Sequence, residues 1–156
     1  MDTKLHFLVV NESPLIQQVI VSLLKEIGYI KVSEAMDGKM ALRALKSAAA
    51  VGNPVNFVIT DSAMPFMNGL ELIRAIRDAP EMKDVPILMV TEEATKDDVI
   101  AAQQAGADAY IVRPFRAANL RNKVQSLLIS KGLKEAEVSL KSFRPFLRTK
   151  TDADES

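Results

Sequence analysis

Residues 55–77, VNFVITDSAMPFMNGLELIRAIR, contain an apolar run, a polar break and a segment of helical periodicity in that order. The run over 55–60 is short and apolar, as expected of a strand that is buried on both faces of a sheet. The segment over 70–77 repeats its large apolar side chains at helical spacing. The stretch therefore predicts a strand and then a helix, with Asp61 at the point where the strand ends.

The same strand-then-helix unit recurs along the chain. Apolar runs of strand length occupy residues 5–10, 30–35, 85–91 and 109–112. Each precedes a segment of helical periodicity, at 14–27, 36–49, 96–105 and 116–131 respectively. Strict alternation of five strands and five helices indicates an α/β fold, because right-handed crossovers place helices on both faces of a parallel sheet. We expect a flavodoxin-like, doubly wound five-stranded sheet in the order 2-1-3-4-5.

The remainder, residues 132–156, has neither the length nor the periodicity of a further module. Basic residues and scattered apolar side chains fill its first part, Phe143 and Phe146 among them, and acidic residues end it. We interpret it as a C-terminal tail appended to a domain of residues 1–131. A short extra helix followed by disorder, a docking segment and plain disorder all remain open for this tail.

The composition excludes several classes of function. With 156 residues, 48% of them apolar and 26% charged, the chain has the make-up of one ordinary globular domain. Lys+Arg and Asp+Glu number 20 each, so bulk charge does not draw the chain to nucleic acid or to a membrane surface. The chain has no Cys, which excludes disulfides, thiol nucleophiles and Cys-based metal sites. A single histidine, His6, excludes a His-based metal site as well. We interpret His6 as a strand residue whose ring nitrogens have hydrogen-bond partners. No stretch resembles a signal peptide or a membrane span, so we expect a cytoplasmic protein without membrane insertion.

Polar residues follow four of the expected strands. Asn11 and Glu12 come after the first strand, Asp61 after the third, and Thr91 and Arg113 end the fourth and fifth. The assumed topology brings all of them to one edge of the sheet, where open parallel sheets bind ligands. Oxygen donors of this kind suit Mg²⁺. An ionised aspartate beside such an ion can attack a phosphoryl group, so Asp61 is the expected nucleophile.

A set of short motifs surrounds these polar residues. In chain order they are FLVV at 7–10, EA at 34–35 with DG at 37–38, MP at 64–65, NGLEL at 68–72, LMVT at 88–91, AGA at 105–107 and RPF at 113–115. Over residues 5–130 this ordered set resembles the receiver domains of two-component response regulators, closest to the stand-alone chemotaxis (CheY-like) type.

The resemblance implies roles for individual residues. It implies that Asp61 accepts a phosphoryl group from a histidine kinase, that Thr91 contacts this group and that Tyr110 reorients when it arrives. It implies a Mg²⁺ site at Glu12, Asp61 and the backbone carbonyl of Ala63, with a weak contribution from Asn11. It also implies a face that binds a protein target, formed by Ala94, Lys96, Val99, Tyr110 and Lys123.

Two departures from the family pattern affect this site. Family members usually carry two acidic residues after the first strand, where this chain has Asn11 and Glu12. The longer Glu12 side chain and the missing charge predict weaker Mg²⁺ binding. The usual lysine before the proline is Arg113, whose planar guanidinium could form a two-pronged hydrogen bond with Asp61 even without phosphate. Such a pair would lower the nucleophilic reactivity of the Asp61 carboxylate.

Each of these residues also has a purely structural interpretation. Asp61 could cap the following loop, Asn11 and Glu12 could cap the first helix beside Ser13, Thr91 could be a β-branched filler, Arg113 a surface cation, and Tyr110 a rim aromatic. We favour the functional interpretation for Asp61, Glu12, Thr91 and Arg113, whereas both interpretations stay open for Asn11 and Tyr110.

We therefore expect a single-domain response regulator that accepts a phosphoryl group at Asp61 and switches a protein-binding face. Its partners are a histidine kinase and a protein target, and its transfer is stoichiometric rather than that of a turnover enzyme. A turnover hydrolase is disfavoured because Ser62 and Ala63 offer no general acid. The alternative is an atypical pseudo-receiver, an interaction module with weak or absent phosphorylation, which Asn11, Glu12 and Arg113 favour.

Overall fold

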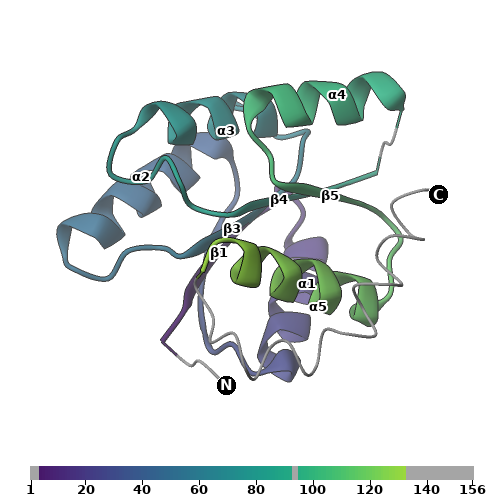
Figure 1. Cartoon of the computed structure of the whole chain (residues 1–156), viewed down its shortest axis with the longest axis horizontal. Coiled ribbons are helices and arrows are strands. Elements are labelled where there is room, and N and C mark those ends of the chain that lie inside the picture. Colours follow the sequence, from purple (N-terminus) through teal and green to yellow (C-terminus); the bar gives the residue numbers. More distant parts are fainter. Residues whose placement is uncertain (1–3, 93–94, 133–156) are drawn as a thin grey trace.

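Five strands alternate with five helices in the computed structural model, which describes residues 4–92 and 95–132 (Figure 1). The strands are β1 (His6–Val10), β2 (Lys31–Ala35), β3 (Phe57–Thr60), β4 (Ile87–Thr91) and β5 (Ala109–Val112). The helices are α1 (Pro14–Ile27), α2 (Gly38–Ala50), α3 (Gly69–Asp78), α4 (Lys96–Ala105) and α5 (Ala117–Ser130). Our expectations for the tail from residue 133 onward and for Ala94 fall outside the described residues.

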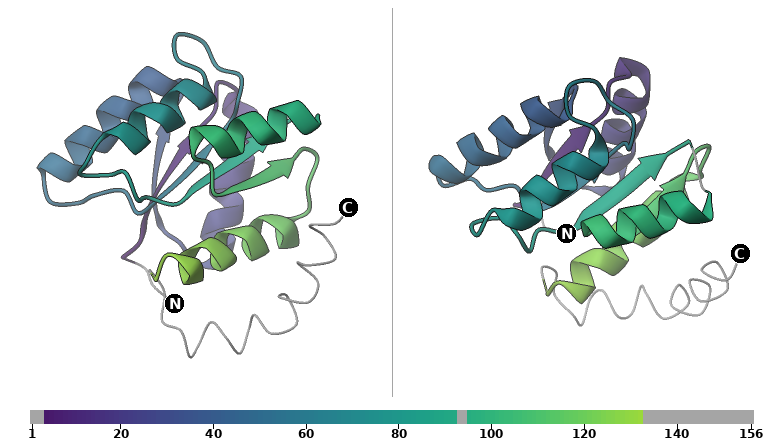
Figure 2. Two further views of the ribbon diagram at one scale, coloured as in Figure 1. Left: turned by 45° about the horizontal axis from the view of Figure 1, so that its top comes forward. Right: turned by 90° about the horizontal axis from the view of Figure 1, so that it is seen from above.

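The strands form one parallel sheet in the order β2-β1-β3-β4-β5. The predicted α/β class, strand order and doubly wound topology are therefore confirmed. Helices α2, α3 and α4 cover one face of the sheet and α1 and α5 cover the other, which gives three layers (Figure 2). The carboxyl ends of β1, β3, β4 and β5 consequently share one edge of the sheet.

Alternate side chains of each strand enter two separate cores. In β1, Phe7 and Val9 pack toward α1 and α5, while Leu8 and Val10 pack toward α2 and α3. Every residue of β1, β3 and β4 is buried, as expected of strands covered by helices on both faces. The sheet is therefore a rigid base for the loops at its carboxyl edge.

Capping side chains set where the helices begin. Ser13 accepts a hydrogen bond from the Ile16 amide at the start of α1, and Asp37 accepts one from the Met40 amide at the start of α2. Helix α2 thus begins at Gly38, two residues later than the expected start at residue 36, because Asp37 is engaged as its cap. Gly28 ends α1 in the left-handed conformation, as its position after the last apolar residue predicts.

The opposite, amino-terminal edge of the sheet holds His6 in a closed hydrogen-bond network. Its Nε2 lies 2.7 Å from Ser33 Oγ and its Nδ1 lies 3.1 Å from the Asn53 carbonyl oxygen. Both ring nitrogens have partners, which confirms the expected satisfied ring.

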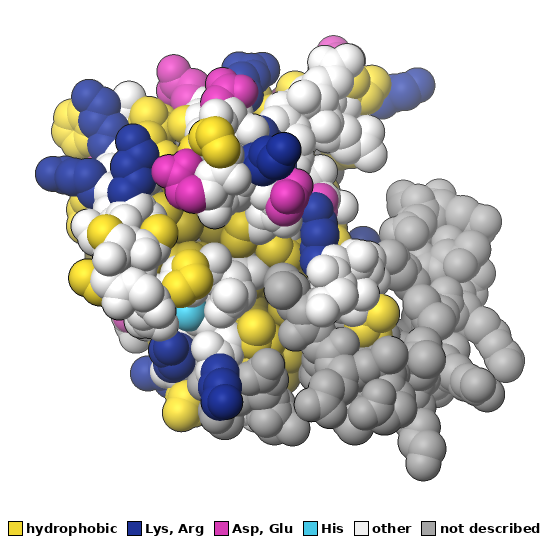
Figure 3. All heavy atoms as spheres, turned by 60° about the vertical axis from the view of Figure 1, so that its left-hand side comes forward, with side chains coloured by type: hydrophobic (Ala, Val, Ile, Leu, Met, Phe, Trp, Pro, Cys, Tyr) yellow, Lys and Arg dark blue, Asp and Glu magenta, His cyan; other side chains and the backbone are white. Residues whose placement is uncertain are grey.

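The face of the molecule shown in Figure 3 is mixed in charge. Acidic and basic side chains are interspersed over this face, without a field of one sign. Within the described ranges, none of the helices combines the length and the apolar character that crossing a bilayer requires.

Candidate functional site

A cavity of about 390 Å³ opens at the carboxyl edge of the sheet. Its lining residues come from the ends of four strands and the loops that follow them: Asn11, Glu12, Ser13, Ile16, Asp61, Ser62, Ala63, Thr91, Glu92 and Arg113. All six residues to which the sequence assigned metal, phosphoryl or pairing roles at this edge lie in this one cavity.

Asp61 lies at the floor of the cavity, directly after β3, and is only 5% exposed. Its Oδ1 accepts a hydrogen bond of 2.6 Å from the Ser62 amide. Its Oδ2 accepts hydrogen bonds from Asn11 Nδ2 at 3.3 Å and from Arg113 Nη2 at 3.4 Å. Both oxygens of this carboxylate therefore accept hydrogen bonds. The bond to Oδ1 is short, whereas the two bonds to Oδ2 are weak because their lengths exceed the usual optimum.

Asn11 turns its amide nitrogen, not its oxygen, toward Asp61. The side-chain oxygen accepts a 2.8 Å hydrogen bond from the Ser13 amide at the entry to α1. Asn11 is 1% exposed, so this neutral donor sits in the protein interior beside the Asp61 carboxylate. In this arrangement the Asn11 amide nitrogen donates to the Asp61 carboxylate, and one lone pair of its oxygen is engaged by the backbone.

Arg113 lines the cavity between Asp61 and Glu92. Its backbone amide donates to the Thr91 carbonyl at 2.7 Å, and the Arg113-Pro114 peptide bond is cis. A single nitrogen, Nη2, lies 3.4 Å from both Asp61 Oδ2 and Glu92 Oε1. The two-pronged pair that the sequence suggested between Arg113 and Asp61 does not form, because among the described contacts only Nη2 reaches Asp61, and Glu92 shares that nitrogen. The Nε of Arg113 is buried and has no hydrogen-bond partner among the described residues.

Thr91 and Ser62 form a hydroxyl pair across the cavity. Their oxygens are 2.6 Å apart, and Thr91 is 2% exposed. The register of β3 and β4 brings together the ends of these two strands. The Thr91 hydroxyl is therefore held near Asp61 by the residue that follows Asp61.

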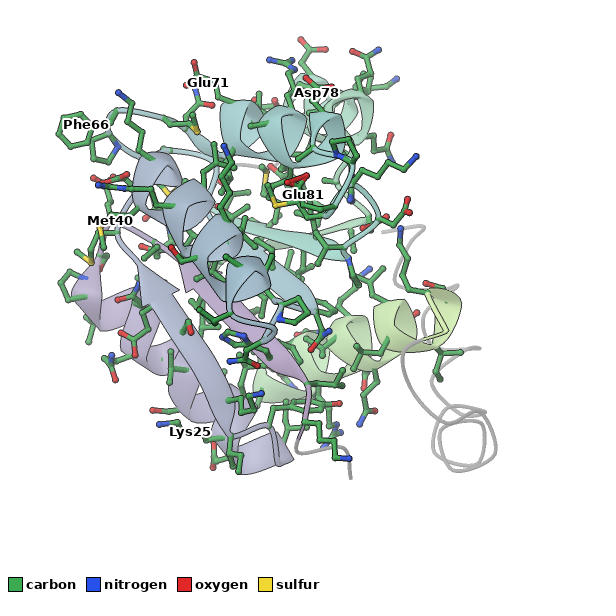
Figure 4. The ribbon with its side chains drawn as sticks, turned by 90° about the vertical axis from the view of Figure 1, so that its left-hand side faces the viewer. Lys25, Met40, Phe66, Glu71, Asp78 and Glu81 are labelled. Atoms are coloured by element: carbon green, nitrogen blue, oxygen red, sulfur yellow. The ribbon has the colours of Figure 1, made fainter. Side chains whose placement is uncertain are left out.

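Gly69, the first residue of α3, allows the loop between β3 and α3 to fold back closely against Asp61. The Gly69 amide donates to the Ser62 carbonyl at 2.9 Å, and a Cβ at Gly69 would meet the Asp61 carbonyl oxygen. At the crest of the loop, Phe66 has a φ of 67° and is 80% exposed. Phe66 and Met40 of α2 project from the same end of the molecule (Figure 4).

The cavity offers few oxygen ligands for a hard divalent cation. Three residues with carboxylates, Glu12, Asp61 and Glu92, line the cavity, and Ala63, whose backbone carbonyl is an expected ligand, lines it as well. Oxygen ligands with water completing the shell are what Mg²⁺ requires. No cluster of three or more Asp, Glu, His or Cys side chains able to hold a metal occurs within residues 4–92 and 95–132. The residues thus fit Mg²⁺ with fewer charges than two adjacent acids after β1 would supply.

Two contributors to this site were missed in the sequence. Glu92 pairs with Arg113, and Ser62 pairs with Thr91. Each directly follows a residue that the strand-end pattern had selected, which is the one signal that could have indicated them. The direction of their side chains depends on the loops, so position alone did not predict the pairing.

The expected target-binding residues that the structure describes lie on α4, β5 and α5, around the edge of the sheet that β5 forms. Lys96 and Val99 are on α4, Tyr110 is on the edge strand β5 and Lys123 is on α5. Tyr110 is half-buried and pairs in register with Met89, while Thr91 pairs with Val112. Side chains of alternate strand residues share a face, so Tyr110 and Thr91 are diagonal neighbours on the same face of the sheet.

Known proteins share this architecture. The response regulator receiver domain family matches residues 7–125. The chemotaxis protein CheY of Pseudomonas aeruginosa PAO1 is 39% identical over 123 residues, which are 79% of this chain and 95% of that protein. Chemotaxis protein CheY4 of Vibrio cholerae, crystallised at pH 4.0, matches with a TM-score of 0.72 and 31% identity over 80% of this chain and 98% of that one.

A third relative carries a metal. The receiver domain of a sensor histidine kinase from Pseudomonas aeruginosa PAO1 matches with a TM-score of 0.68 and 29% identity, over 80% of this chain and 97% of that one. Its structure has a magnesium ion coordinated in the active site cleft. The present chain belongs to the response regulator receiver domain family and is of the CheY-like kind.

Proposed function

We propose that this receiver domain accepts a phosphoryl group on Asp61 and passes the change to a protein-binding face. As a receiver domain it belongs to a class of phosphoryl acceptors rather than of turnover enzymes. The observation that carries the proposal is the position of the Asp61 carboxylate, which lines an open cavity together with a guanidinium and a hydroxyl. A receiver domain implies a histidine kinase as donor, and a protein target is the partner that the face of α4, β5 and α5 suits.

The chemistry is an in-line displacement at phosphorus. An oxygen of the ionised Asp61 forms the new P–O bond while the bond from phosphorus to the donor's leaving atom breaks, and the leaving atom keeps that electron pair. Negative charge on the three equatorial oxygens needs positive or hydrogen-bonding neighbours. Arg113 supplies the cation, and Thr91 supplies a hydroxyl once it leaves Ser62.

Glu12, Asp61 and the Ala63 carbonyl are the residues that would hold Mg²⁺, with Asn11 as a weaker candidate. A bound divalent cation would add positive charge at the transferring group. Because Asn11 brings no charge to the site, we expect this chain to bind the ion weakly.

The route to the protein-binding face runs along the sheet. A phosphoryl group that draws the Thr91 hydroxyl inward vacates space next to Tyr110, its diagonal neighbour on the same face. Such a ligand acts by favouring one of two pre-existing arrangements. Lys96, Val99, Tyr110 and Lys123 would then present a changed surface to the target, with Ala94 as the further member that the family resemblance implies.

One observation favours the alternative of a pseudo-receiver. Both oxygens of Asp61 are already engaged, by Ser62, Asn11 and Arg113, so the carboxylate has partners without any phosphoryl group. In that case the pairing would hold a single conformation, and the fold would serve as an interaction module.

Intact-mass measurement after incubation with acetyl phosphate separates the two functions. We expect the wild type to gain the mass of one phosphoryl group when Mg²⁺ is present and much less of it when EDTA is present. Asp61→Asn should gain none, because its amide oxygen is a poor nucleophile. Asp78→Asn, which removes a charge from the exposed end of α3, should behave as the wild type. A wild type that gains no mass at any Mg²⁺ concentration would establish the pseudo-receiver.

A further inference from the structure

Glu92 is a cavity residue to which no role is yet assigned. It follows Thr91 at the end of β4 and lines the same cavity as Asp61. Its Oε1 lies 3.4 Å from Arg113 Nη2, the nitrogen that is also 3.4 Å from Asp61 Oδ2. One guanidinium nitrogen therefore lies between two carboxylates, each at a distance too long for a strong hydrogen bond.

The two carboxylates differ in their environment. The Glu92 side chain is 73% exposed, whereas that of Asp61 is 7% exposed. Water and salt screen an exposed ion pair far more than a buried one. Arg113 is therefore held more loosely by Glu92 than a phosphoryl group on Asp61 could hold it.

Arg113 also has a donor to spare. Its Nε is buried and has no partner among the described residues. A buried N–H without an acceptor is unfavourable, so an acceptor that reaches it gains more than an ordinary hydrogen bond would. Phosphoryl oxygens are such acceptors, and guanidinium groups bind them through two nitrogens at once.

We propose that Glu92 is a positioning residue that holds Arg113 between the two carboxylates and releases it when a phosphoryl group arrives. The inference rests on the proposed function of Asp61. The arriving group adds negative charge beside Asp61, and Arg113 turns its Nη2 and Nε to the phosphoryl oxygens. Glu92 then loses its partner. Since Glu92 lies in the connection between β4 and α4, occupation of the cavity releases a carboxylate on the path to α4.

A binding measurement tests the consequence that Glu92 opposes occupation of the site. The probe is beryllium trifluoride, a non-covalent stand-in for a phosphoryl group, titrated with Mg²⁺ into the full chain by calorimetry. Glu92→Gln should bind it about twofold to fivefold more tightly than the wild type, the range that an exposed ion pair supports. Glu92→Asp, which keeps the charge, should stay near the wild type, and added salt should narrow the difference.

Glu81→Gln is the matched control, because it removes the same charge from an exposed residue in the connection between α3 and β4, labelled in Figure 4, that does not line the cavity. It should bind the probe as the wild type does. Equal tightening by Glu81→Gln would show a general charge effect and would overturn the inference, as would unchanged or weaker binding by Glu92→Gln.

A spectroscopic signature tests the pairing itself. The Nε–H resonance of Arg113 can be assigned in nitrogen-15 spectra by its loss in Arg113→Lys. We expect it to shift when beryllium trifluoride binds, and to shift in Glu92→Gln without any probe. A resonance that ignores the Glu92 substitution would overturn the pairing. If the wild type, Glu92→Gln and Glu92→Asp all fail to bind the probe, the proposed function falls and this inference with it. Binding by the wild type that Glu92→Gln does not tighten refutes the inference alone.

Discussion

Asn11 determines how much charge surrounds Asp61. Its amide donates to Asp61 Oδ2 at 3.3 Å from a position that is 1% exposed. A carboxylate there would be buried against another carboxylate, a repulsion that the single long contact from Arg113 offsets only in part and that a bound divalent cation would offset further. The neutral amide therefore stabilises the metal-free protein at the expense of metal affinity.

Asn11→Asp should reverse this balance. Without metal, we expect the free energy of unfolding to fall by about 1–3 kcal/mol, because two buried carboxylates face each other. Mg²⁺ should bind roughly tenfold more tightly, the factor that an added attraction of about 1.4 kcal/mol provides. Urea unfolding with EDTA and with Mg²⁺, together with calorimetric titration of Mg²⁺, measures both effects.

Asn119→Asp is the control for that prediction, because Asn119 is exposed in the first turn of α5 and its side-chain oxygen accepts from the Arg116 amide. It should leave Mg²⁺ affinity unchanged. Equal Mg²⁺ affinity of Asn11→Asp and the wild type would contradict the assignment of the metal to this cavity.

The positions of the site residues were largely predictable, but their partners were not. Apolar runs that stop at Asn11, Asp61, Thr91 and Arg113 mark strand ends, and a parallel sheet brings strand ends together. That Glu92 would share Arg113 with Asp61 depends on the loop after β4, and no periodic pattern encodes a loop's path. The strand-end pattern predicts which residues lie close together. The path of the backbone through the loops determines which of their atoms form contacts.

At the scale of elements, Arg77 joins α3 to the strands beside it. Its Nε and Nη2 donate to the Gly106 carbonyl at 3.0 and 2.8 Å, and its Nη1 donates to the Lys83 and Val85 carbonyls at 2.6 and 2.7 Å. Its Nη2 also pairs with Asp108 at 2.9 Å. The guanidinium thus binds the chain segments that enter β4 and β5.

Replacing this guanidinium should loosen those entries. We expect Arg77→Lys to lower the free energy of unfolding by about 1–3 kcal/mol, because an ammonium cannot reach all of these carbonyls from one place. Arg74→Lys, on the exposed side of the same helix, should change it by less than about 0.5 kcal/mol. Urea unfolding followed by circular dichroism gives both values. Equal stability of the two variants would show that the Arg77 contacts contribute nothing net.

Element boundaries were predictable where a cap and an apolar pattern agree. Helix α4 spans the expected Lys96–Ala105, with Thr95 as its cap and the left-handed Gly106 at its end. Helix α2 starts later than expected because Met36, an apolar residue that precedes the cap Asp37, extends the apolar pattern toward the N-terminus. Where pattern and cap disagree, the cap determines the first turn, since it satisfies amides that the helix itself cannot.

At the scale of the whole molecule, the sheet divides the core into two parts that the same strands supply. Phe7, Phe57 and Tyr29 lie in the core beneath α1 and α5, with ring centroids of Phe7 and Tyr29 at 4.7 Å. The core beneath α2, α3 and α4 contains the alternate side chains of the same β-strands, and Tyr110 packs at its margin. If either layer of helices detached, it would expose one face of the strands on which the other layer packs.

This shared sheet predicts one cooperative unfolding transition. The chain has no Trp and two Tyr, one beside each core, so Tyr110→Phe reports fluorescence from Tyr29 alone and Tyr29→Phe reports it from Tyr110 alone. In urea, the fluorescence midpoint of each variant should coincide with that variant's own midpoint by far-ultraviolet circular dichroism. If Tyr110 changed at lower urea than the backbone signal, the layer of α2, α3 and α4 would open separately. A binding event at Asp61 could then reach the target face by local unfolding, rather than through the Thr91 and Tyr110 neighbours on an intact sheet.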